Sequence, residues 1–262
     1  MQADLWFWQE AEGLPYLSCH LLAAWQHGFF TREFYPQLPS VLVNYLDSQA
    51  QAFRVKQVHG DRILTPTDIA QLPPASDSPY PPADAVISEA PLQGAWVASA
   101  DCTPVLIGDL KTGQVAAIHA GWRGTAARIV PKTVEKFQQA GSELANLRIA
   151  MGPAIAGVVY QVDPPVALKV GQSLTTVQQL VELDAQWDYL YQGPNPPVLP
   201  DAEPNKCRLD VRRINALQLA ELGIQADQLA IAPYCTLQTP QYFFSYRRTH
   251  TKEVQWSGIV SR

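Results

Sequence analysis

Residues Gly94–Arg128 read GAWVASADCTPVLIGDLKTGQVAAIHAGWRGTAAR, and this stretch decides how the chain folds. It contains three apolar runs, Trp96–Ala100, Val105–Ile107 and Val115–Ile118, and the last two lie on either side of a polar turn. The turn Leu110–Gly113 ends in a glycine that can adopt positive φ, and this pattern predicts a β-hairpin over the two runs. We therefore place the candidate functional residues relative to this hairpin.

The predicted hairpin brings Cys102 and His119 side by side, because Thr103 falls opposite His119 to within about one residue of register. A thiolate beside an imidazole suits zinc or copper, and it also suits a nucleophilic cysteine with its base. Single Cys and His residues are more often packing or satisfied polar residues, so these two alone leave that interpretation open. Two neighbouring features favour a site. We expect Pro104 to interrupt strand pairing, and Ala120–Gly124 combines two glycines with an Arg suited to an anion.

A third candidate ligand, His59, lies upstream in Val55–Asp61, which we interpret as an alternating strand that ends on the histidine. Three protein ligands with an open fourth position are typical of a catalytic zinc site. None of the compact zinc-ligand spacings is present, so spacing alone does not decide between a metal site and a Cys–His dyad. His59 discriminates the two, because a dyad does not need it.

Several motifs together resemble one known family. They are KQVHG at Lys56–Gly60, ADC at Ala100–Cys102, HAGWRG at His119–Gly124, GPAI at Gly152–Ile155 and FFSYRR at Phe243–Arg248, with His27-Gly28-Phe29 and Thr31-Arg32 near the start. In this order they are similar to the YfiH/LACC1 family, from about Trp25 to the C-terminus. That family is described both as a laccase-like multicopper polyphenol oxidase and as a purine nucleoside phosphorylase with adenosine deaminase activity.

The resemblance implies a metal held by His59, Cys102 and His119, the same three residues that the chemistry selects. We expect Zn²⁺, with Cu²⁺ as the alternative. The sequence departs from the family pattern at Glu33–Pro36, at Val158-Val159-Tyr160, where the usual thiol after GPAI is absent, and at Thr249. These departures bear on details that depend on those side chains, and they leave the three ligands in place.

The resemblance implies a zinc-dependent purine nucleoside phosphorylase that takes adenosine, inosine and, as a further candidate, methylthioadenosine, and that also deaminates adenosine. Deamination needs a metal-activated water and an acid/base group, and phosphorolysis needs phosphate held by cationic donors. Cys102 and His119 are the expected catalytic residues, with Asp101 as an orienting or acid/base group. The candidates for binding substrate and phosphate are Arg32, Arg123, Ser245 and Arg248, while His27, Cys235 and His250 are further candidates to line the pocket. The alternatives are a metal-free Cys–His hydrolase or deamidase, a laccase-like copper oxidase and a binding module without turnover.

Composition limits the remaining possibilities. The chain has 262 residues, a net charge of −5 and no block of basic residues, so a nucleic-acid groove is not expected. Its four scattered cysteines are expected to be reduced thiols, Cys207 serving as packing. No apolar run is long enough to span a membrane, so we expect a cytoplasmic enzyme of small molecules, with its oligomeric state open. Five histidines are too few for a multicopper cluster with many imidazole ligands.

The fold expected from the whole sequence is a single α/β domain over residues 1–262, with mixed, layered β-sheets and outer helices. The resemblance implies a cysteine-hydrolase-like version of that fold. The other strands are expected at Leu5–Trp8 and Tyr16–Leu22 (including His20), joined by a turn at Gly13-Leu14-Pro15, and at Asp84–Ser88, Leu147–Met151, Leu229–Pro233 and Val254–Val260. Helices are expected within Thr125–Ala140, with a start or kink at Pro131, within Pro164–Val181 and at Asp210–Leu222 with Gly223 as C-cap. Gln71–Ala83 and Asp184–Glu203 are expected to be irregular loops.

Overall fold

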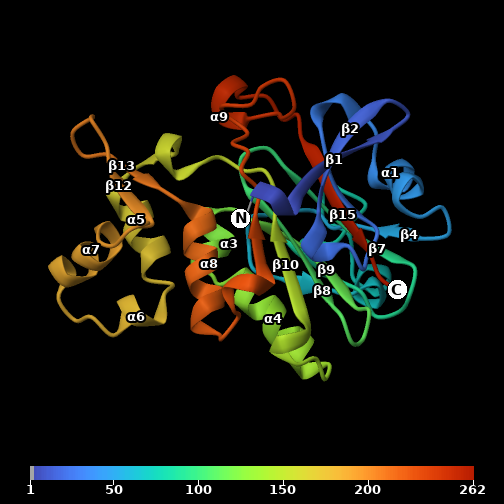
Figure 1. Ribbon diagram of the computed structural model, residues 1–262, viewed down its shortest axis with the longest axis horizontal. Coiled ribbons are helices and arrows are strands. Elements are labelled where there is room, and N and C mark those ends of the chain that lie inside the picture. Colours follow the sequence, from blue (N-terminus) through green and yellow to red (C-terminus); the bar gives the residue numbers. More distant parts are fainter. Residues whose placement is uncertain (1–2) are drawn as a thin grey trace.

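The computed structural model describes residues 3–262, which form two six-stranded sheets and one three-stranded sheet (Figure 1). The first sheet has the order β1-β2-β3-β15-β7-β4, the second β14-β10-β8-β9-β6-β5, and the third β11-β13-β12. The strands are β1 Trp6–Ala11, β2 Leu14–Cys19, β3 His27–Phe30, β4 Gln51–Phe53, β5 Ile63–Leu64, β6 Ala85–Ile87, β7 Gln93–Ser99, β8 Thr103–Asp109, β9 Val115–Ala120, β10 Leu147–Met151, β11 Gln161–Val162, β12 Val198–Pro200, β13 Cys207–Leu209, β14 Leu229–Ile231 and β15 Gln255–Val260. The parallel pairs β4–β7, β5–β6 and β10–β14 make both large sheets mixed, as the sequence predicts.

The helices are α1 Pro39–Leu46, α2 Pro66–Gln71, α3 Trp122–Ala126, α4 Ile129–Gln139, α5 Pro164–Gly171, α6 Thr175–Gln178, α7 Leu183–Tyr191, α8 Val211–Glu221 and α9 Tyr246–Thr249. One apolar cluster lies between the two large sheets. A second packs the outer face of the second sheet against α4 and α8, and a third packs the first sheet against α1. The chain therefore forms four layers, helix, sheet, sheet and helix, which confirms the predicted layered α/β architecture with outer helices.

The central strands are apolar on both faces because each separates two of these clusters. In β9, Val115 and Ala117 face the core between the sheets, whereas Ala116, Ile118 and Ala120 face the helical layer. Strands covered on both faces show such near-continuous apolar runs. His119 shares the parity of Val115, so its side chain belongs to the inter-sheet side at the end of the strand.

The predicted hairpin is confirmed. β8 and β9 pair antiparallel, and Gly113 in their turn has φ of +78°. Thr103 lies opposite Ala120, and Pro104 opposite His119, which is within the predicted one-residue margin.

The expectation that Pro104 interrupts pairing is wrong. The ladder between β8 and β9 continues through Pro104 to Thr103. The carbonyl of Pro104 accepts a hydrogen bond from the N–H of Gly152, on the β10 side. The N and C=O of one strand residue point to the same side, so the nitrogen of Pro104, which carries no hydrogen, also faces the β10 side. The hydrogen bonds between β8 and β9 therefore do not need an N–H from Pro104.

Four other local predictions need correction. The segment that carries His59 is a loop after the short strand β4, not an alternating strand. His20 begins a 3-10 turn, not part of a strand, and the first turn lies at Glu12 and Gly13, so that Leu14 and Pro15 already belong to β2. Asp184–Glu203 contains α7 and β12, whose aromatic and apolar side chains pack into a further apolar cluster.

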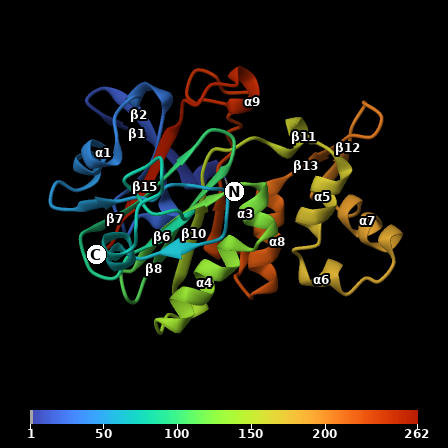
Figure 2. The same cartoon turned by 180° about the vertical axis from the view of Figure 1, so that it is seen from behind.

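The remaining helices follow the sequence closely. The Thr125–Ala140 region splits into α3 and α4, with Arg128 in the left-handed conformation between them and Pro131 in the first turn of α4. α8 spans Val211–Glu221, and Gly223 after it has φ of +98°. Figures 1 and 2 show α5, α6 and α7 projecting to one side of the two large sheets, together with the small sheet. Within residues 3–262, no helix combines the length and apolar character needed to cross a bilayer.

Candidate metal centre

Two chain crossovers between the large sheets come together, and each carries a predicted ligand. Cys102 lies between β7 of the first sheet and β8 of the second, and His59 lies between β4 of the first and β5 of the second. Asp101 and His59 both have positive φ, of 93° and 60°. Non-glycine residues in this region mark sharp turns that the surrounding structure holds in place.

His119 joins these crossovers from the end of β9. The ligand atoms of His59, Cys102 and His119 all lie within 4.8 Å of one another, and they form a possible metal-binding group within residues 3–262. In a tetrahedral zinc site the N and S donors are roughly 3.3–3.6 Å apart. The three side chains could therefore hold one ion, and the donor set of one thiolate and two imidazoles suits zinc or copper.

A buried carboxylate, Asp84, orients both histidines. Its oxygens accept hydrogen bonds from the backbone N–H groups of Val58 (3.2 Å), His59 (2.9 Å) and Gly60 (2.7 Å). Oδ1 also lies 2.8 Å from Nδ1 of His119. A carboxylate bonded to one ring nitrogen fixes the tautomer and leaves the other nitrogen to a metal. We conclude that Asp84 holds the His59 loop and the His119 ring in one arrangement.

Cys102 and His119 perturb each other's pKa. Burial alone would raise the pKa of the Cys102 thiol, but the charge of His119 and hydrogen bonds from His119 and His59 lower it to about 6. Burial likewise disfavours the charged form of His119, yet the Cys102 thiolate and Asp84 raise the pKa of His119 to about 9. A thiolate is the form of cysteine that binds metals and attacks electrophiles, so the site is prepared for either use.

The two glycines of HAGWRG permit this packing. A Cβ on Gly121 would lie 2.8 Å from Sγ of Cys102 and 3.4 Å from Cδ2 of His59. A Cβ on Gly124 would lie 2.8 Å from the carbonyl oxygen of Gly60. The close backbone approach expected from the sequence is therefore real, and it seats α3 against the ligand loop.

Asp101 holds the crossover next to Cys102. Its carboxylate accepts hydrogen bonds from Thr236 Oγ1 (2.6 Å) and from the backbone N–H of Arg247 (2.7 Å). Its carbonyl accepts from the N–H of Ile155 in the GPAI segment. The FFSYRR and GPAI motifs thus meet at the residue that precedes the cysteine.

The predicted phosphate-binding residues lie in different environments. Arg123 is exposed and stacks on Trp122, with its guanidinium carbon 4.4 Å from the ring centroid. Arg32 donates to the carbonyl of Pro240 and stacks on Phe244, whereas buried Ser245 accepts from the N–H of Arg248. The guanidinium of Arg248 donates to three backbone carbonyls, those of Thr236, Leu237 and Phe243. Among the four, Arg123 presents its side chain most freely.

The other candidate residues have structural partners. The buried ring of His27 is bonded to the N–H of Cys19 and the carbonyl of Trp25, and burial lowers its pKa. Cys235 accepts from the N–H of Ala156 through Sγ, at 3.2 Å. His250 is exposed and makes an edge contact with Tyr246, and His20 stacks on Phe7. Cys207 is buried in an apolar cluster, as expected.

Sequence reasoning missed three residues that lie beside the candidate ligands. They are Asp84, Arg247, whose N–H bonds Asp101, and Tyr160, whose ring carries the Arg247 guanidinium. Asp84 carries a weak signal, since it is an acidic residue that directly precedes an apolar strand after a proline-rich loop. Arg247 stands beside Arg248 in the same motif, and only its contacts distinguish the two. Tyr160 ends the segment Val158–Tyr160, where the sequence departs from the family pattern, but nothing there indicated a contact with Arg247.

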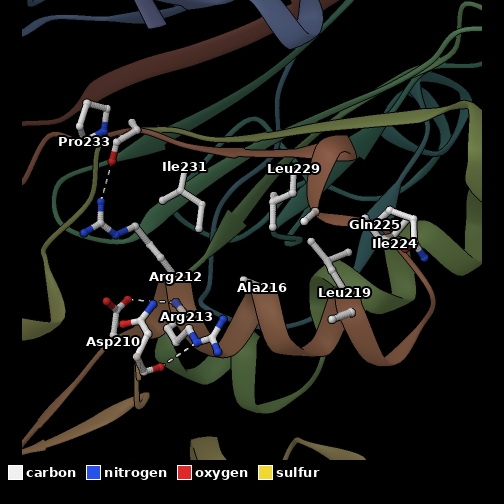
Figure 3. A pocket seen from close by; sticks show the side chains of 14 residues that line it. Asp210, Arg212, Arg213, Ala216, Leu219, Ile224, Gln225, Leu229, Ile231 and Pro233 are labelled. Carbon is white, nitrogen blue, oxygen red and sulfur yellow. Dashed lines mark hydrogen bonds between the residues drawn. The ribbon is translucent and has the colours of Figure 1, made fainter. Parts of the chain in front are cut away.

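A surface groove of about 510 Å³ lies elsewhere, between α8 and β14. Figure 3 shows Ala216 and Leu219 of α8 on one side and Leu229 and Ile231 on the other, with Arg212 at one end bonded to the chain. Arg212 donates to the carbonyls of Ala232 and Tyr234. None of the predicted site residues lines this groove.

Comparison with known proteins places these features among close relatives. Residues 40–260 match the protein family described as multi-copper polyphenol oxidoreductase laccase. A purine nucleoside phosphorylase of Synechocystis sp. is 69% identical over 261 residues, which cover 100% of this chain and 99% of the relative. A purine nucleoside phosphorylase of Haemophilus influenzae is 33% identical over 73% of this chain and 67% of its own length.

Two crystal structures have the same overall fold. YlmD from Geobacillus stearothermophilus superposes with a TM-score of 0.78 at 22% identity, covering 97% of this chain and 98% of its own. YfiH from Bacillus licheniformis gives 0.75 at 24% identity, covering 94% and 96%. At these identities the likeness shows the fold.

Proposed function

The chain belongs to the family described as multi-copper polyphenol oxidoreductase laccase, as its motifs predicted, and from that premise we propose that it is a zinc-dependent purine nucleoside phosphorylase. The proposed substrates are adenosine, inosine and methylthioadenosine, together with inorganic phosphate. Deamination of adenosine is proposed as a second reaction of the same site. The relatives named purine nucleoside phosphorylase support the first activity over laccase chemistry.

The observation that carries the proposal is the His59–Cys102–His119 group with Asp84 behind it. Two imidazoles and one thiolate suit zinc, and the three residues would hold it as its protein ligands. A bound zinc ion supplies a Lewis acid that polarises a substrate oxygen or activates water. Asp84 supports this use because it fixes the ring of one ligand and the backbone of another.

Phosphorolysis requires that the protein bind phosphate next to the ribose. A phosphate oxygen forms a bond to C1′ while the bond from C1′ to the purine nitrogen breaks. The electron pair leaves with the purine, which takes up a proton, and the products are the free base and pentose 1-phosphate. Exposed Arg123, four residues after His119, supports anion binding, and the crossover held by Asp101 supports orientation of Cys102.

One observation favours a second candidate, a metal-free Cys–His hydrolase or deamidase. The lowered pKa of Cys102 and the raised pKa of His119 are those of a nucleophile with its base. His59 separates the candidates, because a dyad would work without it.

Base release from adenosine and inosine, measured with and without phosphate, tests the proposal. We expect adenine and hypoxanthine to appear only when phosphate is present. In the same assay, inosine formed from adenosine reports the deaminase reaction. Equal base release in both conditions, or none in either, would discard phosphorolysis.

A further inference from the structure

Two adjacent arginines of α9, Arg247 and Arg248, have opposite environments. Nη1 of Arg248 lies 2.8 Å from the carbonyl oxygen of Thr236 and 3.0 Å from that of Leu237, and Nη2 lies 2.7 Å from that of Phe243. These bonds tie together the loop that leads into α9. The guanidinium of Arg248 is thus used to hold the chain, and its donors have neutral oxygen partners.

Arg247 is held beside Cys102 by its backbone, while much of its guanidinium stays available. Its N–H donates to Oδ2 of Asp101, the residue before Cys102, at 2.7 Å. Its Nη1 donates to the carbonyl of Gln161 at 2.9 Å, and its guanidinium carbon lies 4.9 Å from the ring centroid of Tyr160. Within residues 3–262 no carboxylate pairs with this guanidinium, so its charge is not neutralised by the protein.

Arg123 is a second uncompensated cation. It lies two residues after Gly121, where an added Cβ would meet Cys102 and His59, and its guanidinium stacks on the Trp122 ring. In the part of the chain that the structure describes, it has neither an ion pair nor a hydrogen bond from its side chain. Guanidinium groups stacked on aromatic rings are preorganised, which lowers the entropy lost when they bind an anion.

The two aromatic rings that carry these guanidinium groups belong to one packed region. The guanidinium of Arg247 lies over the Tyr160 ring and that of Arg123 over the Trp122 ring, and both rings pack against the same apolar cluster. The backbone bond from Arg247 to Asp101 and the close approach of Gly121 to Cys102 tie both segments to the candidate metal ligands. Burial raises the pKa of Tyr160 to about 12, so its hydroxyl stays protonated.

We propose that Arg247 and Arg123 together form the phosphate-binding subsite, with the Tyr160 ring as the platform that positions Arg247, and that Arg248 is a structural residue. This rests on the proposed phosphorylase function. Two charge-assisted contacts from separate elements, α3 and α9, would fix the phosphate beside the metal ligands.

The test measures binding of inorganic phosphate to the zinc-loaded protein by calorimetry, alongside the KM values for phosphate and inosine. We expect Arg247→Gln and Arg123→Gln each to weaken phosphate binding by about 10-fold or more, the usual effect of losing a hydrogen bond to a charged group. The KM for inosine should change by less than about two-fold if the loss is confined to phosphate. Tyr160→Phe should bind phosphate like wild type, and Tyr160→Leu should bind it more weakly, because only the latter removes the platform.

Lys136→Gln is the matched control, since it removes one exposed positive charge from α4 and should leave phosphate binding unchanged. Arg248→Lys should lower the thermal stability and leave the phosphate affinity of the folded protein within about two-fold of wild type, since it keeps the charge but loses carbonyl bonds.

Calorimetry separates this inference from the proposed function, because phosphate binding does not require turnover. Loss of phosphate affinity in folded Arg247→Gln supports the subsite whether or not base release is detected. Unchanged affinity in Arg247→Gln, or no phosphate binding by the wild-type protein, would overturn it.

Discussion

At the scale of single residues, the candidate site depends on Asp84, a carboxylate that is not itself one of the candidate metal ligands. Asp84 is fully buried, and its two oxygens serve three backbone N–H groups and one imidazole. A buried carboxylate that accepts several hydrogen bonds is held in one position. The geometry of two ligands therefore follows from one side chain.

Replacing that carboxylate by an amide should loosen the metal. In Asp84→Asn an NH₂ group replaces one of the carboxylate oxygens that accept hydrogen bonds from the His59 loop and the His119 ring. Because an NH₂ group cannot accept these bonds, we expect zinc affinity to fall by about 10- to 100-fold. Competition with a chromophoric chelator measures this. Asp109→Asn is the control, because Asp109 is also buried but accepts from the N–H of Lys111, far along β8 from Cys102; it should lose stability and keep zinc affinity.

The three proposed ligands should each be necessary. We expect the purified protein to hold about one zinc per chain, and His59→Ala, Cys102→Ala and His119→Ala each to lose it, because two remaining ligands bind weakly. Elemental analysis measures the content, with Cys235→Ala and His250→Ala as controls that retain zinc. Full occupancy in His59→Ala would contradict the three-ligand site.

Much of this residue-level picture could be predicted from the sequence. His59, Cys102 and His119 could be found because thiolate and imidazole have few uses other than packing, metal binding and nucleophilic catalysis. Asp84 and Arg247 could not, since their roles depend on hydrogen bonds between segments far apart in the chain.

At the scale of elements, the site is built by crossovers between sheets. The β7–β8 and β4–β5 connections each pass from one large sheet to the other, and α3 packs beneath them through glycines. The β8–β9 hairpin was predictable because its turn and its apolar runs are local signals. The His59 loop was not, since its conformation is imposed by Asp84 and by the crossover.

The contact between α3 and the ligands predicts a strong effect at Gly121. In Gly121→Ala the new methyl group would displace Sγ of Cys102, now 2.8 Å from its position, and zinc affinity should fall by at least about 10-fold. Gly60→Ala provides the contrast, because a Cβ there meets its nearest atom at 3.5 Å, an ordinary contact. Equal zinc affinity in the two variants would show that this packing does not position the cysteine.

Gly152, the first residue of the GPAI motif, is explained by close packing between the sheets. A Cβ on Gly152 would lie 2.1 Å from the ring of Phe29, which belongs to the HGF motif. Overpacking of this kind costs about 1–3 kcal/mol. Urea unfolding of zinc-loaded Gly152→Ala should show that loss, and a change below about 0.5 kcal/mol would contradict the assignment.

At the scale of the whole molecule, the candidate site lies where two connections between the large sheets come together. The layered α/β class could be predicted from mixed strand and helix patterns, whereas the order of strands depends on long-range pairing that periodicity does not encode. The relative that matches the full length supports our proposal that residues 1–262 act as one domain.

The composition also bears on the laccase description of the family. Of the five histidines, His20, His27 and His250 have partners outside the candidate site. Copper binds N and S ligands more tightly than zinc, so copper-loaded protein should show at most slow phenol oxidation, with loss of nucleoside turnover. Robust oxidation with several coppers per chain, measured by spectroscopy and metal counting, would favour a laccase.

We propose that phosphorolysis takes place at the His59–Cys102–His119 group. Inosine conversion can be followed while zinc occupancy is titrated from zero to one, with hypoxanthine and pentose 1-phosphate counted together. We expect the two products in equal amounts, at a rate proportional to occupancy. Hypoxanthine released without pentose 1-phosphate, or at full rate in zinc-free protein, would contradict it.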